Sequence, residues 1–202
     1  LAASAWFAVK LPTLRALVDW SFDLLNPPEQ ALFARLAVFV GGFDLTAAEQ
    51  VCSAAPLHTD DVLDLLASLV DKSLVMLDEH DGAGRYRMLE TIREYAHEKL
   101  QERGELEANE RRHCEHFFAL AKQARDGMRH GEQGEWIQRL EADLDNVRAA
   151  MNASVAGDVD PVVAVKLAVA LQQFWSLRGY STEGRRFLDT VLQLPAIRES
   201  EL

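Results

Sequence analysis

The chain has 202 residues, of which 49% are hydrophobic and 26% are charged, so it can form one large or two small folded domains and is not a disordered chain. Its formal net charge of −11 disfavours nucleic-acid binding, because domains that bind nucleic acids usually carry a basic face. Two cysteines, Cys52 and Cys114, are too few and too far apart in sequence for a disulfide framework, and no apolar run reaches the roughly 18 residues of a membrane span, so we expect a cytoplasmic protein without a membrane partner.

The N-terminal part of the sequence predicts two helices. Residues 1–11 are apolar but lack a basic segment, so we interpret them as a linker or the start of an expressed fragment and not as a signal peptide. Thr13 is placed to cap a first helix, TLRALVDWSFDLL. Residues 26–29, NPPE, combine an N-cap residue, proline at the first helical position and an acid three residues on, which predicts a capping box at the start of a second helix.

A glycine-rich turn and two more helices follow. Residues 40–43, VGGF, predict the turn, after which Thr46 and Glu49 have the spacing of a capping box for a short helix. Thr59 or Asp60 can cap the next helix. Its apolar face consists of Val62, Leu65, Leu66, Leu69 and Val70.

The central stretch predicts a β-hairpin that runs directly into a helix. Residues 72–78 and 85–89 have the composition and alternation of strands, and they are joined across residues 81–84, DGAG. After Leu89 the apolar period changes from two to about 3.6, and Gly104 stands where a glycine would end the helix. Helix, hairpin and helix in this order are the outline of a winged helix.

The rest of the chain predicts helices only. Apolar residues recur at helical spacing over residues 105–128 and 135–151, with a glycine-rich segment between them. Pro161 can open a further helix that Gly179 closes, and Ser181 caps the next one. Paired antiparallel helices with short links are typical of a helical repeat, and two hairpins are fewer than the three units that a stable array usually needs. We therefore expect the array to continue in a longer protein.

Three segments carry a resemblance to a known family. VDKSLV, RYRMLETIREYA and LAVFVGGFDLTAAEQVC closely resemble the winged helix of the signal-transduction ATPases with numerous domains, the STAND class, and in particular the bacterial regulators of the LuxR and AfsR type. RLEADLDNVRAAM and QQFWSLRGYSTEGRRFLDTVL look like the tetratricopeptide-like helices that follow the winged helix in those regulators. The predicted fold class is thus all-α with one small β-hairpin: a winged helix over residues 12–102, then antiparallel tetratricopeptide-like hairpins over 105–202.

The resemblance implies a regulatory function within a longer protein. In the family an ATPase core precedes the winged helix, so ATP or ADP is expected in the full-length protein and no cofactor in this part. The winged helix would lock its own upstream ATPase core in the ADP-bound off state, and the helical array would receive a signal protein or a small-molecule inducer. DNA would be bound by another domain.

The resemblance also proposes residues that sense the nucleotide. Met88, Leu89 and Glu90 occupy the place of a Met-His-Asp motif whose histidine, in plant and animal relatives, contacts the phosphates of bound ADP. Leu89 replaces that histidine, and from proximity alone Arg87 or Arg93 is the candidate to take over phosphate sensing. Glu90 can instead act at the N-terminus of the following helix, where a negative charge is favourable.

Two rival hypotheses concern DNA and scaffolding. A winged helix that itself reads DNA would use Lys72, Arg85 and Arg87 on phosphates. Residues 1–100 contain 8 Lys and Arg against 15 Asp and Glu, a net charge of −7, and the segment 60–70 has three aspartates and no Lys or Arg, which argues against this hypothesis. The other rival is a stand-alone scaffold that binds peptides through its helices.

No residue pattern indicates catalysis. The sequence has no GxxxxGK[ST] loop and no nucleophile with a base and an orienting group, so we expect no enzymatic activity from this chain alone. His113, Cys114 and His116 lack a fourth ligand at a zinc-like spacing, and we expect no metal site. Three aromatic residues of the helical part can line a ligand groove or, as we favour, belong to the ordinary core: Trp136, Phe174 and Trp175.

Overall fold

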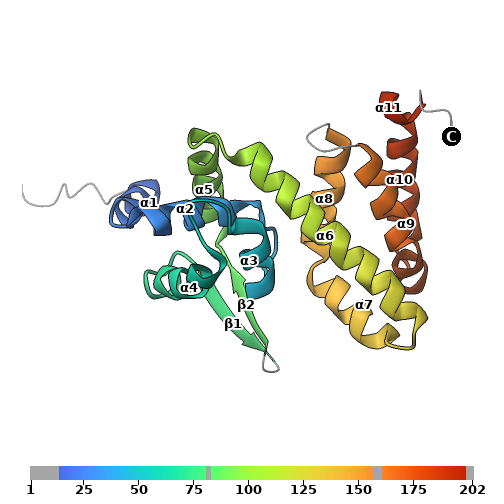
Figure 1. Ribbon diagram of the computed structural model, residues 1–202, viewed down its shortest axis with the longest axis horizontal. Coiled ribbons are helices and arrows are strands. Elements are labelled where there is room, and N and C mark those ends of the chain that lie inside the picture. Colours follow the sequence, from blue (N-terminus) through green and yellow to red (C-terminus); the bar gives the residue numbers. More distant parts are fainter. Residues whose placement is uncertain (1–13, 81–82, 157–160, 199–202) are drawn as a thin grey trace, which may run out of the picture.

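The computed structural model describes residues 14–80, 83–156 and 161–198, and it confirms an all-α fold with one two-stranded antiparallel sheet in those ranges. Figure 1 shows a winged helix joined by one long helix to a set of antiparallel helices. The first part contains α1 (Leu14–Asp23), α2 (Pro27–Arg35), η1 (Leu36–Val38), α3 (Leu45–Cys52), η2 (Thr59–Asp61), α4 (Val62–Asp71), β1 (Met76–His80), β2 (Ala83–Arg87) and α5 (Glu90–Glu102). The second contains α6 (Leu106–Arg129), α7 (Gln133–Ala142), α8 (Leu144–Ala156), α9 (Pro161–Arg178), α10 (Ser181–Gln193) and α11 (Pro195–Arg198).

The predicted capping box at the start of α2 is confirmed. The Asn26 side chain accepts a hydrogen bond from the backbone N–H of Glu29 at 2.9 Å, and the Glu29 carboxylate accepts one from the Asn26 N–H, also at 2.9 Å. Glu29 is 5% exposed, and its other oxygen accepts hydrogen bonds from Ser68 and Lys72 of the α4 region. The cap therefore also holds α2 against α4.

Two other predicted caps are wrong. Asp44, and not Thr46, caps α3, because its side chain accepts the backbone N–H of Ala47 at 2.7 Å. Neither Thr59 nor Asp60 caps α4: both belong to a 3-10 turn, and α4 begins after it without a side-chain cap. In each case the helix begins at a different residue from the one that the residue spacing in the sequence predicts. The predicted cap at Thr13 lies outside the described residues.

The hairpin is confirmed, but its first strand starts later than predicted. β1 pairs with β2 from Met76 opposite Arg87 onward. Residues 72–75 instead close α4, with Ser73 at φ +57° and the N–H groups of Leu74 and Val75 donating to the carbonyl of Leu69. This turn sends Leu74 and Val75 into the core, where both are buried.

A third extended segment joins the hairpin. Phe43 and Tyr86 form a bridge in which each backbone N–H donates to the other residue's carbonyl at 2.8 Å. After the hairpin, α5 ends as predicted at Gly104, which has φ +68°, and the N–H groups of Gly104 and Glu105 donate back to the carbonyls of Gln101 and Leu100. These contacts place the Gly41-Gly42 turn beside β2.

The second part differs from the prediction in one helix. The segment expected as one helix over residues 135–151 is two helices, α7 and α8, which meet at Asp143. α6 packs against α8 and α9, and α10 packs against α9. Gly179, at φ +78°, lies between α9 and α10 as predicted.

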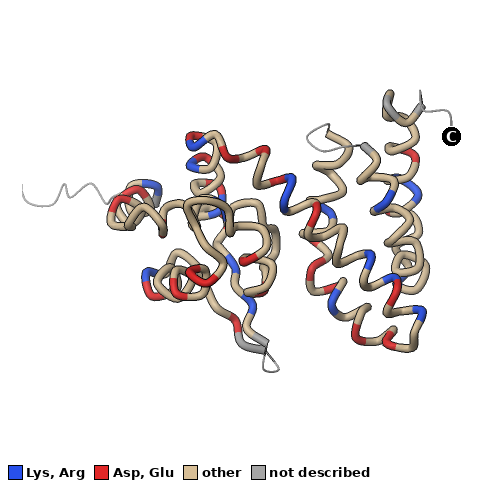
Figure 2. The backbone as a smooth tube through the Cα atoms, viewed as in Figure 1, with Lys and Arg blue, Asp and Glu red and all other residues tan. Residues whose placement is uncertain are grey.

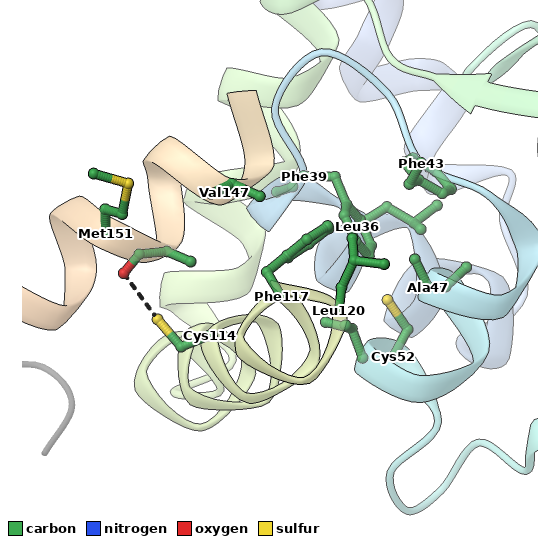
Figure 3. Close-up of a cluster of buried hydrophobic side chains, with 14 of the residues drawn as sticks. Leu36, Phe39, Phe43, Ala47, Cys52, Cys114, Phe117, Leu120, Val147 and Met151 are labelled. Atoms are coloured by element: carbon green, nitrogen blue, oxygen red, sulfur yellow. Dashed lines mark hydrogen bonds between the residues drawn. The ribbon is translucent and has the colours of Figure 1, made fainter. Parts of the chain in front are cut away.

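One hydrophobic core runs through both parts. Phe39 and Phe43 stack with ring centroids 4.5 Å apart, and Phe117 of α6 meets Phe39 edge-on at 6.3 Å. Figure 3 shows this cluster continuing past Phe117 to Val147 and Met151 of α8. The core crosses the turn between α5 and α6.

Replacing Asn26 with alanine is expected to lower the free energy of unfolding by about 1 kcal/mol, because the first turn of α2 loses its cap. The matched control is Asn26→Ser, which keeps a side-chain oxygen and should recover most of the loss. Urea denaturation followed by circular dichroism measures both. Equal losses in the two variants would show that the side chain acts through something other than capping.

Candidate functional site

The helix in the recognition position of the winged helix has an acidic outer face. α4 follows α3 across the turn, and its exposed positions, with those just before it, are Asp60, Asp61, Leu63, Asp64, Ala67 and Asp71. Leu63 is 48% exposed, and α4 contains no Lys or Arg. Figure 2 shows Asp and Glu around this helix. Such a face repels the phosphates of DNA and suits contact with a protein.

Each of the three candidate DNA contacts is already held by a carboxylate. The Lys72 ammonium lies 2.5 Å from Glu29, the Arg85 guanidinium 2.7 Å from Asp143, and the Arg87 guanidinium 2.5 Å from Asp78. Burial raises the pKa of Glu29, but the hydrogen bonds from Lys72 and Ser68 outweigh it and leave the pKa below its ordinary value. These cations have their charges compensated within the chain.

The nucleotide-sensing candidates lie at the turn from β2 into α5. Glu90 and Arg93 form a bidentate pair, at 3.0 and 2.5 Å, and the Arg93 guanidinium also donates to the carbonyl of Ala37 at 3.2 Å. Hydrogen bonding from Arg93 lowers the pKa of Glu90. Leu89 is 48% exposed at the N-cap of α5. The structure therefore brings Leu89, Glu90 and Arg93 to one turn.

The other two candidates at this turn face elsewhere. Met88 is partly buried and packs against the hydrophobic core. Arg87 reaches along the hairpin to Asp78. The predicted group of five thus separates into an exposed corner, a core residue and a strand-surface ion pair.

A buried amide that the sequence analysis missed joins the two parts of the chain. Asn146 of α8 is fully buried; its side-chain oxygen accepts the N–H of Val40 at 2.7 Å and its NH₂ donates to the carbonyl of Gly42 at 2.6 Å. His113 lies 3.4 Å from the same oxygen. Gly41 has φ +80°, and a Cβ there would lie 2.9 Å from the Asp145 carboxylate, so this turn requires glycine. The VGGF motif was the only sequence signal for this joint.

Two buried charges strengthen the same joint. Arg85 of β2 donates to Asp143 at the α7–α8 corner and to the carbonyl of Ala142 at 3.0 Å. Burial raises the pKa of Asp143, and the ion pair with Arg85 opposes that shift. Arg35, which is 2% exposed, pairs with Glu105 at 2.7 Å and donates to the carbonyl of Cys52 at 2.8 Å. Neither role was predictable from local sequence patterns, because the partners lie far apart along the chain.

His113, Cys114 and His116 each have a separate partner. His113 faces Asn146, the Cys114 thiol donates to the carbonyl of Ala150 at 3.2 Å, and His116 lies 2.8 Å from the Gln50 amide oxygen. Across residues 14–80, 83–156 and 161–198, no group of three His, Cys, Asp or Glu side chains could hold a metal ion.

The aromatic residues of the helical part are mainly core. Phe174 is fully buried and Trp175 is 4% exposed. Trp136 is partly buried, and its indole N–H donates to Glu132 at 3.0 Å. Phe174 and Trp175 therefore belong to the core and do not line an open groove.

The described helices include none that is long and apolar enough to cross a membrane.

Comparison with known proteins agrees with the winged-helix fold of the first part of the chain. Residues 25–101 match the family described as "Winged helix-turn-helix domain", which spans α2 to α5. The chain is 43% identical over 182 residues, 90% of its length, to "Putative HTH-type transcriptional regulator Rv0890c" of Mycobacterium tuberculosis and to the protein named in the same way, Mb0914c, of Mycobacterium bovis. It is 42% identical over 123 residues to "Uncharacterized protein Rv0894" of Mycobacterium tuberculosis, which is 60% of this chain and 30% of that protein.

The chain covers only part of these relatives. It spans 20% of the length of each of the two named regulators. No solved structure matches the chain significantly. Residues 25–101 thus match the winged helix-turn-helix family, and over these residues the structure has the helices and hairpin of a winged helix.

Replacing Asn146 with alanine is expected to lower the free energy of unfolding by about 2 kcal/mol, because the partly buried N–H of Val40 loses its partner and the carbonyl of Gly42 keeps only Arg85, at 3.2 Å. Asn152→Ala, an exposed position on the same helix, should change it by less than about 0.5 kcal/mol. Denaturant unfolding measures both variants. Similar values for the two would contradict the role of the buried amide.

His113 is expected to make the protein acid-sensitive. Burial lowers its pKa from 6.5 to about 4, so the unfolded chain binds a proton that the folded chain excludes, and stability falls as the pH drops from about 6.5 to 4. The slope is at most about 1.4 kcal/mol per pH unit for one proton. In His113→Gln, which keeps a donor toward Asn146, the loss of stability over this range should be smaller. An unchanged difference between pH 7 and pH 5 would rule out His113 as the source.

Proposed function

We propose that this chain is the winged-helix and helical portion of a transcriptional regulator. The proposal is supported by the winged helix-turn-helix match and by the two relatives named as HTH-type transcriptional regulators, which are similar to nearly the whole chain. The finer part of the proposal rests on the charge of the winged-helix surface. The recognition helix is acidic, and the cations around it are paired with carboxylates.

The geometry favours a docking module over a direct reader of DNA. A DNA-reading helix places Arg, Lys, Asn or Gln on base edges and cations on phosphates, whereas α4 exposes aspartates and leucine. We therefore propose the finer function that the resemblance implies: in a STAND-type regulator, this winged helix packs on an ATPase core of the same longer protein and stabilises its ADP-bound off state. ATP or ADP would be bound by that core.

The corner of Leu89, Glu90 and Arg93 is the proposed contact with the core. Leu89 supplies exposed apolar surface, and the Arg93 guanidinium retains N–H groups beyond those that bond Glu90 and Ala37. A phosphate or a carboxylate of the core near this corner would be held by Arg93. The helical part would receive the signal, and DNA would be bound by another domain of the regulator.

The second candidate is a winged helix that contacts DNA itself. The domain match and the relatives' names favour it more directly than they favour an ATPase switch. It would require Lys72, Arg85 and Arg87 to leave their carboxylate partners for DNA phosphates. Separating these partly buried ion pairs costs free energy, and only this hypothesis requires it, so we rank it second.

DNA binding separates the two candidates. Titration of the chain into a labelled duplex of random sequence at about 0.15 M salt is expected to give no complex tighter than roughly 10⁻⁴ M, the weak end of non-specific binding. Asp60→Lys combined with Asp64→Lys should produce binding that weakens with salt. Tighter, salt-dependent binding by the unaltered chain, lost in Lys72→Ala with Arg85→Ala, would favour the second candidate.

Association with the ATPase core tests the first candidate. The ADP-loaded core, expressed from the preceding part of the longer protein, is expected to bind the chain more tightly than the core loaded with a non-hydrolysable ATP analogue. Leu89→Asp should weaken binding about tenfold, or about 1.4 kcal/mol, while improving the cap of α5. Leu17→Asp, at 47% exposure on α1, is the control. Equal binding with both nucleotides would contradict the lock.

A further inference from the structure

The free positive charges of the described chain all lie in the helical part. Every Lys and Arg side chain from α1 to the end of α5 has a hydrogen bond or ion pair to a carboxylate within the part of the chain that the structure describes. Among the described side chains of α6 to α10, by contrast, several ammonium and guanidinium groups have no such partner: Lys122, Arg129, Lys166, Arg185 and Arg186. In a chain of net charge −11, an uncompensated cation marks a surface open to an anionic partner.

Two of these free cations border one hollow between α6 and α9. Lys122 of α6 and Lys166 of α9 are both exposed and line a hollow of 390 Å³. Arg125 lies on the same edge as Lys122, one helical turn on, and is paired only with its neighbour Asp126 at 3.0 Å. The remaining lining is apolar and comes from Phe118, Val165, Val169 and Ala170. Figure 2 shows Lys and Arg recurring along the C-terminal half of α6.

α9 presents apolar residues as well as Lys166 to this hollow, in addition to its apolar packed side. Leu167, Leu171 and Phe174 are fully buried against the neighbouring helices. Its outer side carries Val162, 44% exposed, and Val169, 52% exposed. A surface helix normally has a polar outer face, whereas this part of α9 exposes two valines on either side of Lys166. The outer side of α9 therefore has the composition of a contact surface.

We propose that the hollow between α6 and α9 binds an acidic amphipathic helix of a partner protein. The aliphatic floor fits leucine-like side chains, and Lys122, Arg125 and Lys166 at its edges fit carboxylates on either side of them. Single-stranded nucleic acid would require exposed aromatic rings for stacking, and the described lining offers only the partly buried Phe118. The inference deepens the proposed role of the helical part as the receiver of a signal, and it is independent of how the winged helix works.

The test uses the whole chain and a labelled synthetic helix that carries leucine at i, i+3, i+4 and i+7 and glutamate at the other positions. Fluorescence anisotropy measures binding. Lys122→Glu combined with Lys166→Glu is expected to weaken binding at least tenfold. The matched control, Arg185→Glu combined with Arg186→Glu, makes the same change in net charge with free cations of α10 and should weaken it less than threefold. Val169→Asp should also weaken binding at least tenfold.

Three results would overturn the proposal. Equal weakening by the two double variants would mean that the peptide responds only to net charge, and unchanged binding by Val169→Asp would mean that the apolar floor is not used. Competition by single-stranded DNA or inorganic phosphate as strong as by unlabelled peptide would assign the surface to phosphate. Leu89→Asp should bind the peptide as the unaltered chain does. Peptide binding is therefore independent of whether the winged helix binds the ATPase core.

Discussion

The requirement that buried backbone groups keep their hydrogen bonds organises this structure around Asn146. The turn at residues 40–42 follows α2 and η1 at the edge of the core, where the N–H of Val40 is partly buried and Gly42 is buried. One side-chain amide, delivered from α8 more than 100 residues later, satisfies both. Two glycines with positive φ allow this close packing: Gly41 passes beside the Asp145 carboxylate and Gly42 beside the carbonyl of Tyr86. The winged helix and the helical part are thereby joined by a polar contact that tolerates little displacement, since a small shift leaves the N–H of Val40 unpaired and the carbonyl of Gly42 with Arg85 alone.

The same joint explains why a winged helix here has so little charge to offer DNA. Arg85, a candidate phosphate contact in the sequence, is bound at the α7–α8 corner by Asp143. Lys72 is held by Glu29, whose other contacts form the cap of α2. The basic side chains of this domain thus stabilise its own packing, and its exposed recognition helix is left acidic. Charge that remains available to partners is found in the helical part, on α6, α9 and α10.

Short-range chemistry was predictable from the sequence. The capping box of Asn26 and Glu29, the hairpin and the stop at Gly104 each depend on residues a few positions apart, and all three are present. The errors began where local signals compete: Asp44 and Thr46 are both able to cap α3, and the entry of the chain decides between them. The break at Asp143 and the role of Asn146 depend on contacts across 58 and 106 residues. The role of Arg35 depends on a contact across 70 residues. No periodicity in the sequence reports contacts of this kind.

The candidate site was likewise predictable from the sequence only in part. The sequence could propose the turn at Leu89, Glu90 and Arg93, because a family resemblance covers it, and the structure brings these three together. It could not indicate that Met88 belongs to the core or that Arg87 pairs with Asp78, because both depend on the strand register.

The most direct test of the account is native-state hydrogen exchange at the Val40 amide, which donates to Asn146 across the joint. If the two parts form one cooperative structure, this amide exchanges only through global unfolding, with the same free energy as the most protected amides of α2 and α6. Exchange through a local opening several kcal/mol below that value, while α2 and α6 remain protected, would show that the joint opens on its own and would contradict the account.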